Sequence, residues 1–174
     1  MLDENIVAIL KKRPESKIVK ECRVDEDYMS TYSYVKELFK DDVDKGGNPY
    51  IGHLERVANK CKDVSKDAMI IGLLHDVIED KGVTPKDLQD KGYNLNIVKG
   101  VALLTKTEFE TYSNYIDVLV NNGSIDALYV KKADLEDNMN LSRLKEVTER
   151  DINRLEKRYI PTWKKVVKRI KEIE

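Results

Sequence analysis

Four side chains that could do acid–base or metal chemistry lie together in an otherwise apolar stretch, His75, Asp76, Glu79 and Asp80. On a continuous helix they would lie at about 0°, 100°, 40° and 140° around the axis, with the apolar residues on the other side. An imidazole nitrogen and carboxylate oxygens directed at one spot are ligands that a divalent cation prefers. Burying them without such a cation would be costly. The stretch therefore predicts a metal site.

The remaining sequence supplies helices to position these residues. Apolar residues recur at helical spacing through most of the chain, and alternating strand patterns are nearly absent. We predict an all-α, compact bundle of about eight helices, with helical segments at 4–12, 27–41, 49–63, 66–80, 84–91, 94–104, 109–121, 125–140 and a charged amphipathic pair over 144–173 that is broken or kinked at Pro161.

Local signals set some helix ends. Asn48 followed by Pro49 is typical of an N-cap and a first helical position, so a helix is expected to begin there. Thr84 with Asp87 three residues later is a capping box for the short helix that follows. Gly82 is expected to end the helix that carries His75.

Composition narrows the class of protein. The 174 residues are expected to form one domain, 1–174, and the net charge of −1 gives no reason to expect nucleic acid or an anionic membrane as partner. Cys22 and Cys61 are interpreted as reduced thiols, with Cys61 in the core, and neither a signal peptide nor an apolar span of about 20 residues is evident. These features predict a cytoplasmic protein.

The order His53, then His75-Asp76, then Asp134 resembles the His…His-Asp…Asp pattern of the HD superfamily of metal-dependent phosphohydrolases. Around these positions, four short runs occur in an order that resembles the hydrolase domain of the (p)ppGpp synthetase/hydrolases of the stringent response and their small stand-alone relatives, over a motif core of about 30–170. The runs that carry the resemblance are Gly47-Asn48-Pro49-Tyr50-Ile51-Gly52-His53, Leu73-Leu74-His75-Asp76-Val77-Ile78-Glu79-Asp80, Leu104-Thr105-Lys106, and Ala133-Asp134 with Asn138-Met139.

The resemblance implies a role for each matching residue. Glu79 and Asp80 would position and deprotonate the attacking water, and the metal, Mn²⁺ in this family, would be bound by His53, His75, Asp76 and Asp134. Substrate contacts would come from Lys45, Lys106, Asn138 and Tyr159. The chemistry agrees, because a cation neutralises phosphoryl charge and lowers the pKa of bound water, while a carboxylate beside it can accept the proton.

Some positions depart from the family pattern. Asp44 stands where most of the family has an arginine that stacks on guanine, and Leu54 stands where the family usually has proline. The usual Asp-Arg-Leu-His-Asn run is here Asp134-Leu135-Glu136-Asp137-Asn138, and we interpret Asp137 as a residue that faces solvent. The basic run at 164–169 is interpreted as the solvated face of a terminal helix. The residues that the resemblance assigns to the metal are all present, whereas the residues that recognise the base in this family are altered.

The sequence thus predicts a metal-dependent nucleotide phosphohydrolase. In the most specific form of this prediction, a metal-bound hydroxide removes the 3′-pyrophosphate from (p)ppGpp. No synthetase domain is expected to follow. One alternative is hydrolysis of another nucleotide, a 5′-nucleotide or a dNTP, at the same centre. Another is a nucleotide-binding regulatory module with little turnover, against which Glu79 and Asp80 argue. A nucleotide is the expected partner, and a homo-oligomer is possible.

Overall fold

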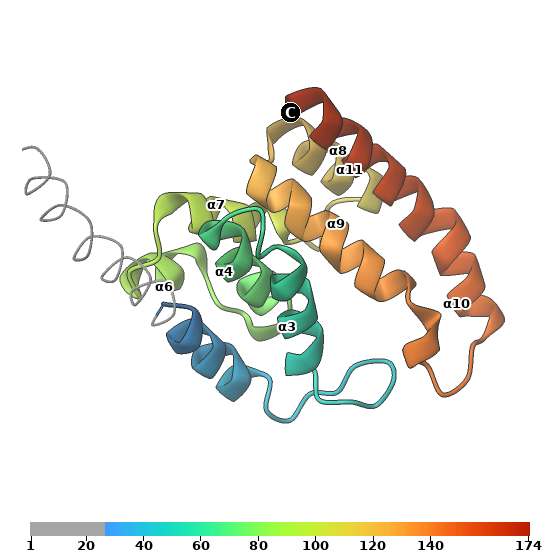
Figure 1. The fold of residues 1–174 in the computed structure, drawn as a ribbon, viewed down its shortest axis with the longest axis horizontal. Coiled ribbons are helices and arrows are strands. Elements are labelled where there is room, and N and C mark those ends of the chain that lie inside the picture. Colours follow the sequence, from blue (N-terminus) through green and yellow to red (C-terminus); the bar gives the residue numbers. More distant parts are fainter. Residues whose placement is uncertain (1–26) are drawn as a thin grey trace, which may run out of the picture.

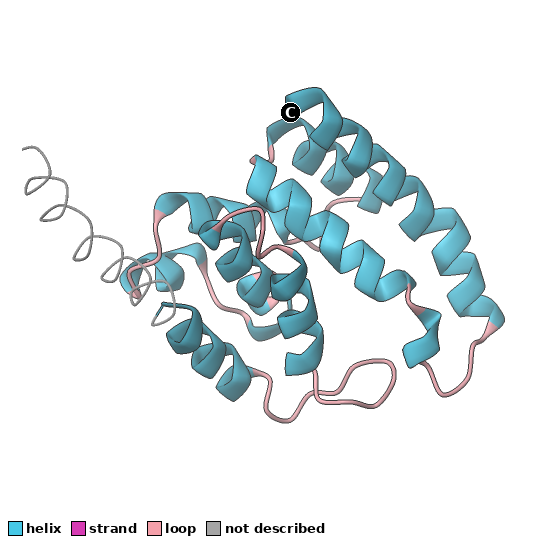
Figure 2. Cartoon of the chain, in the orientation of Figure 1, coloured by secondary structure: helices cyan, strands magenta, loops and turns pink. Residues whose placement is uncertain are grey.

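The computed structural model describes residues 27–174, so the predicted helix at 4–12 and Cys22 lie outside the described residues. The described residues form helices joined by loops and turns, with no strand apart from one isolated bridge between Val43 and Pro49 (Figures 1 and 2). Its helical segments are 27–38, α3 (Ile51–Lys60), α4 (Lys66–Leu74), α5 (Val77–Lys81), α6 (Pro85–Asp90), α7 (Leu95–Leu104), α8 (Tyr112–Asn122), α9 (Ile125–Met139), a 3₁₀ turn (Leu141–Arg143), α10 (Glu149–Arg154), a π turn (Leu155–Tyr159) and α11 (Ile160–Ile173).

Helix α4 lies at the centre of the fold. It packs against α3, α7 and α9, while α11 packs along α9 and α8 (Figure 1). Because α4 is apolar nearly all round, it is buried on all sides rather than along one stripe. The fully buried side chains at this junction include Leu54 and Val57 of α3, Leu73 and Leu74 of α4, and Leu128 and Leu135 of α9. In the described part of the chain no helix is both long and apolar enough to cross a membrane.

Helices α3 and α4 approach closely at Gly72. A Cβ atom built there would lie 2.8 Å from Cα of Ala58, and this backbone atom cannot move aside without shifting α3. We expect Gly72→Ala to lower the free energy of unfolding by about 1–3 kcal/mol, as overpacking of a close-packed core does. Urea denaturation measures the change.

Gly52→Ala on α3 is the control for this prediction. There the nearest atom to an added Cβ is the end of the flexible Arg56 side chain, at 3.3 Å. Since alanine favours a helix over glycine by about 1 kcal/mol, this variant should be as stable as the wild type or more so. A Gly72→Ala variant with wild-type stability would show that the two helices are not in rigid contact.

The predicted continuous helix over 66–80 is wrong at its most important point. Helix α4 ends at Leu74, His75 and Asp76 form a turn, and α5 begins at Val77. The ring of His75 explains the break, because its Nδ1 donates to the carbonyl oxygen of Gly72 at 2.8 Å. In a continuous helix that carbonyl would accept the amide of Asp76.

The predicted start of the next helix upstream is also wrong. Helix α3 begins at Ile51 with Tyr50 as its N-cap, not at Asn48 and Pro49. The carbonyl of Asn48 accepts the amide of Asp44 at 2.7 Å, and Pro49 pairs with Val43 in the isolated bridge. These contacts hold the two residues in an extended loop, so the helix begins after them.

The C-terminal pair is interrupted just before Pro161, close to the predicted position. The turn over Leu155–Tyr159 is a π turn, and Pro161 lies in the first turn of α11. Proline lacks an amide hydrogen and its ring crowds the carbonyl four residues earlier, so the widened turn accommodates it.

Candidate metal centre

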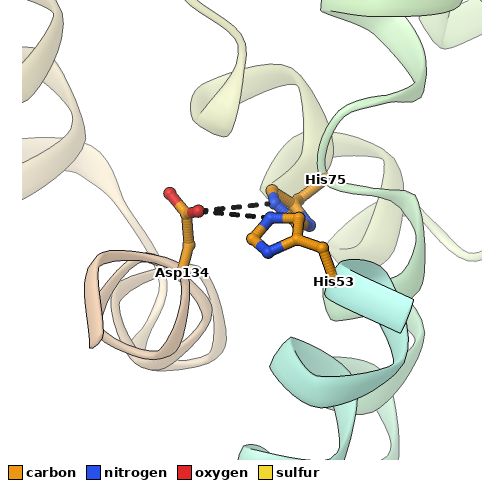
Figure 3. Close-up of side chains that lie close together, drawn as sticks. All are labelled: His53, His75 and Asp134. Atoms are coloured by element: carbon orange, nitrogen blue, oxygen red, sulfur yellow. Dashed lines mark ion pairs between the residues drawn. The ribbon is translucent and has the colours of Figure 1, made fainter. Parts of the chain in front are cut away.

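Three separate parts of the fold bring the predicted metal-binding residues to one place. His53 comes from α3, His75 from the turn after α4, and Asp134 from α9 (Figure 3). The Oδ1 atom of Asp134 lies 3.5 Å from Nε2 of His53 and 3.8 Å from Nε2 of His75. All three residues are buried, and their ligand atoms lie within 4.8 Å of one another.

Asp76 completes the cluster. Its Oδ2 atom lies 3.1 Å from Nε2 of His75 and 3.8 Å from Nε2 of His53. The same oxygen accepts a hydrogen bond of 2.6 Å from the hydroxyl of Tyr50, which fixes the carboxylate. The structure therefore brings all four residues of the predicted set into one cluster.

Hydrogen bonds on the far side of each ring determine which nitrogen faces the cluster. Nδ1 of His53 donates to Oδ2 of Asp137 at 2.7 Å, and Nδ1 of His75 donates to the carbonyl of Gly72 at 2.8 Å. In the neutral imidazole both Nε2 atoms then carry a lone pair. Carboxylates and carbonyls in this position are the usual outer partners of metal-binding histidines.

The cluster is electrostatically incomplete without a cation. Nε2 of His75 is buried and makes no hydrogen bond within residues 27–174. Burial lowers the pKa of His75, but the carboxylates of Asp76 and Asp134 more than compensate and raise it well above its usual value. The imidazole would therefore hold a proton unless another positive charge took its place. Nitrogen and oxygen donors of this kind suit a divalent first-row metal, so the group could hold one.

Asp137 is part of a buried charge network, so the interpretation that it faces solvent is wrong. Besides His53, it accepts hydrogen bonds from Nε and Nη2 of Arg56 at 2.8 and 3.1 Å. Burial alone would raise the pKa of Asp137, but the hydrogen bonds from His53 and Arg56 hold this pKa well below its usual range. Arg143 lies between Asp137 and Asp44, donating to the Asp137 carbonyl at 2.8 Å and to the Asp44 carboxylate at 3.0 Å.

The same network explains Asp44, which departs from the family pattern. Its carboxylate is buried and accepts the amides of Gly46 at 2.8 Å and Asn48 at 3.0 Å. Asp44 therefore shapes the loop before α3 and, through Arg143, ties it to the end of α9.

We expect Asp137→Ala to weaken metal binding by about ten- to a hundredfold, the usual cost of losing the outer partner of a metal-binding histidine. The change frees the ring of His53 to rotate and leaves Arg56 without its main partner. Calorimetric titration with Mn²⁺ measures the effect. Glu136→Gln is the matched control, because this neighbour on α9 bonds Trp163 outside the cluster. Equal Mn²⁺ affinity in Asp137→Ala and wild type would contradict the prediction.

Glu79 and Asp80 lie on α5, beside the cluster. Glu79 lines the pocket above the four side chains, and its Oε2 accepts the backbone amide of Lys106 at 3.1 Å. Asp80 is adjacent but does not line that pocket. Burial and the neighbouring carboxylates of Asp76 and Glu79 raise the pKa of Asp80 to about 6. Of the two predicted catalytic residues, the structure thus places Glu79 in the pocket itself.

The predicted substrate residues differ in position. Lys106, Asn138 and Tyr159 line the pocket. Lys45 does not, but its Nζ lies 3.2 Å from the hydroxyl of Tyr159. The amide of Asn138 donates to Oδ1 of Asp134 at 2.6 Å. Asn138 therefore contacts a predicted metal ligand directly.

Sequence reasoning missed other residues of the site. Lys131 is largely buried, and its Nζ donates to Oδ2 of Asp134 at 3.0 Å. Burial lowers the pKa of Lys131, but the nearby carboxylate of Asp134 raises this pKa by a larger amount. Lys131 therefore stays charged. Tyr50 precedes His53 by three residues, and Lys131 and Asp137 flank Asp134 at the same spacing. Residues three apart share a helix face, and this signal was available in the sequence.

Comparisons with known proteins agree with the fold and with the sequence resemblance. No family model matches the chain. An alignment over 90 positions, which covers 49% of this chain, shows 30% identity to a guanosine-3′,5′-bis(diphosphate) 3′-pyrophosphohydrolase of Aquifex aeolicus (strain VF5). The match spans only 13% of that protein.

A solved structure has the same fold. It is described as "A metazoan ortholog of SpoT hydrolyzes ppGpp and plays a role in starvation responses", and it matches with a TM-score of 0.65 and 21% identity over 82% of this chain and 84% of that one. The predicted all-α fold is thereby confirmed. The resemblance to ppGpp hydrolase domains is also confirmed.

Proposed function

We propose that this protein is a metal-dependent phosphohydrolase that removes pyrophosphate from the 3′ position of guanosine 3′,5′-bis(diphosphate). One observation carries the proposal: two imidazoles and two aspartates from three parts of the fold converge, with Glu79 at the same pocket. The names of the two relatives supply the substrate. The cysteine-poor composition and the nucleotide substrate support a cytoplasmic location and a role in the stringent response.

The metal would be held by His53, His75, Asp76 and Asp134, and we propose Mn²⁺. When bound, a divalent cation neutralises phosphoryl charge and makes water more acidic. Lys131 and Asn138 hold the carboxylate of Asp134 in position from the other side. The hydroxyl of Tyr50 does the same for Asp76.

Glu79 is the proposed general base. The backbone amide of Lys106 fixes its carboxylate at the pocket, where it can take a proton from the attacking water. The water oxygen bonds to phosphorus, the bond from phosphorus to the 3′ oxygen breaks, and that oxygen takes up one proton. Glu79 gives up the proton it accepted, directly or through solvent, which restores its carboxylate. Asp80, beside Glu79, would help to orient the water through its negative charge.

The lining of the pocket suits an anionic substrate. Lys106, Lys131 and Arg158 face it, and with a divalent cation present they outweigh the carboxylates of Asp76, Glu79 and Asp134. Cations around a small pocket raise the local concentration of an anion and speed its capture.

Release of pyrophosphate and phosphate in the presence of Mn²⁺ tests the proposal. We expect turnover of guanosine 3′,5′-bis(diphosphate) to exceed that of GTP, dNTPs and 5′-monophosphates by at least about tenfold, a difference of 1.4 kcal/mol in transition-state binding. Faster turnover of a dNTP or a 5′-monophosphate would keep the hydrolase but change its substrate, in line with the structural role of Asp44. Binding without turnover would favour a regulatory module. Elution volume in gel filtration would show whether the protein forms a homo-oligomer.

A further inference from the structure

The pocket over the metal cluster is too small for a whole nucleotide. Its volume is about 150 Å³. Pockets that enclose small-molecule ligands usually measure about 300–1,000 Å³. This pocket can therefore take the reacting phosphates, and the rest of the nucleotide must lie elsewhere.

A second cavity adjoins this pocket between α8 and the C-terminal helical run, which lie side by side (Figure 1). We call it the α8–α11 cleft. It measures about 360 Å³, and Tyr112 and Arg158 line both it and the metal pocket. Its other lining residues are Ser113, Ile116, Lys157, Pro161, Thr162 and Lys165. A ligand that leaves the metal pocket past Tyr112 and Arg158 enters the cleft.

The charge of the α8–α11 cleft is positive. Its lining includes Lys157, Arg158 and Lys165, and no carboxylate among the lining residues. Lys165 pairs with Asp117, but no carboxylate of residues 27–174 pairs with Lys157 or Arg158. The basic run at 164–169 is therefore not only a solvated face, since Lys165 borders a cavity.

Arg158 is already oriented for binding. Its guanidinium carbon lies 3.8 Å from the centre of the Tyr112 ring. Stacking on an aromatic face restrains the planar guanidinium and leaves its edge N–H groups available for two oxygens of one phosphate. The π turn over Leu155–Tyr159 places Arg158 and Tyr159 together on the lining of the metal pocket.

We propose that the α8–α11 cleft binds the non-reacting diphosphate of a nucleotide that carries phosphates at both ends, with Arg158 and Lys157 as its ligands. The proposal rests on the proposed function, because the reacting pyrophosphate must occupy the metal pocket. A neutral base in the cleft would leave Lys157 and Arg158 without a counter-charge. Specificity would then arise largely from a second phosphate group rather than from the guanine-stacking position that Asp44 occupies.

Two substrates that differ only at the 5′ position test the assignment. The first is guanosine 3′,5′-bis(diphosphate), and the second is guanosine 3′-diphosphate with a free 5′ hydroxyl. We expect loss of the 5′ diphosphate to raise the KM of the wild type by about ten- to a hundredfold, as for loss of charge-assisted hydrogen bonds. Lys157→Gln should raise the KM for the first substrate by about tenfold, leave kcat nearly unchanged, and leave the second substrate unaffected, because Lys157 lines the cleft but not the metal pocket. Lys164→Gln, an exposed position on α11 that lines neither cavity, is the control.

A binding measurement separates failure of this assignment from failure of the proposed function. Calorimetric titration with guanosine 5′-diphosphate in the presence of EDTA measures binding of a diphosphate to the cleft when no metal is bound. We expect Arg158→Gln and Lys157→Gln each to weaken this binding by about tenfold. If neither substrate is hydrolysed but these losses are seen, the phosphate site stands and the hydrolase is wrong. If Lys157→Gln affects both substrates equally, or leaves diphosphate binding unchanged, the assignment to the α8–α11 cleft is wrong.

Discussion

Asp134→Ala is expected to abolish both metal binding and turnover. Asp134 is the only member of the cluster that α9 contributes, and its carboxylate faces both imidazoles. Loss of an outer partner costs about ten- to a hundredfold in metal affinity, and loss of a ligand should cost more than the upper value. Mn²⁺ affinity by calorimetry and pyrophosphate release by a coupled assay measure the two effects.

Folding must be checked in this variant. Asp134→Ala leaves the largely buried Lys131 without its carboxylate partner, and unpaired buried charge destabilises a protein. Asp134→Asn keeps the shape of the side chain, and thermal unfolding shows whether either variant is folded at the assay temperature.

Asp126→Asn is the matched control, because Asp126 is also a buried aspartate of α9 but bonds Ser65 and Asn96 away from the cluster. We expect it to lose some stability and to keep its Mn²⁺ affinity. If a folded Asp134 variant bound Mn²⁺ as tightly as the wild type, Asp134 would not be a ligand.

Glu79→Gln is expected to slow the chemical step strongly while leaving metal binding nearly unchanged. Glutamine can still accept the Lys106 amide through its side-chain oxygen, so the local structure should persist. It cannot take a proton from water, and loss of a general base typically costs about 10²–10⁴-fold in rate. Mn²⁺ affinity should stay within about threefold of the wild type, because Glu79 is not among the residues that converge on the cluster.

Single-turnover kinetics at saturating Mn²⁺ measure the chemical step in Glu79→Gln. Glu110→Gln, which removes a carboxylate that bonds Thr107 outside the pocket, is the control and should turn over normally. A Glu79→Gln variant with an undiminished rate would mean that Glu79 is not the general base and that the proton goes to another group, such as Asp80, whose pKa is raised to about 6.

The sequence predicted the fold well wherever helical periodicity and local capping agree. Thr84 and Asp87 form the capping box that was expected, and α9 runs from Ile125 to Met139 as the apolar pattern indicated. The predictions failed where a side chain or a loop competes with the backbone ladder. The hydrogen bond from His75 to the Gly72 carbonyl ends α4, and the pairing of Val43 with Pro49 moves the start of α3 to a later residue. Neither contact produces a repeating pattern of apolar residues in the sequence.

Prediction of the site was limited in a different way. The four proposed metal ligands were identified from residue types and family order, and the structure brings them together. The helical spacing around Asp134 could have revealed Lys131 and Asp137 as neighbours. The partners of Asp137 could not be found in this way, because Arg56 lies on another helix and reaches Asp137 only through the packing of α3 against α9.

Anomalous X-ray diffraction from crystals grown with MnCl₂ tests the central claim most directly. We expect one strong manganese peak per chain among Nε2 of His53, Nε2 of His75 and the carboxylates of Asp76 and Asp134, with ligand distances near those usual for nitrogen and oxygen donors. Manganese bound elsewhere, or no peak at this cluster while the four side chains keep their positions, would contradict a metal centre shared by the three parts of the fold.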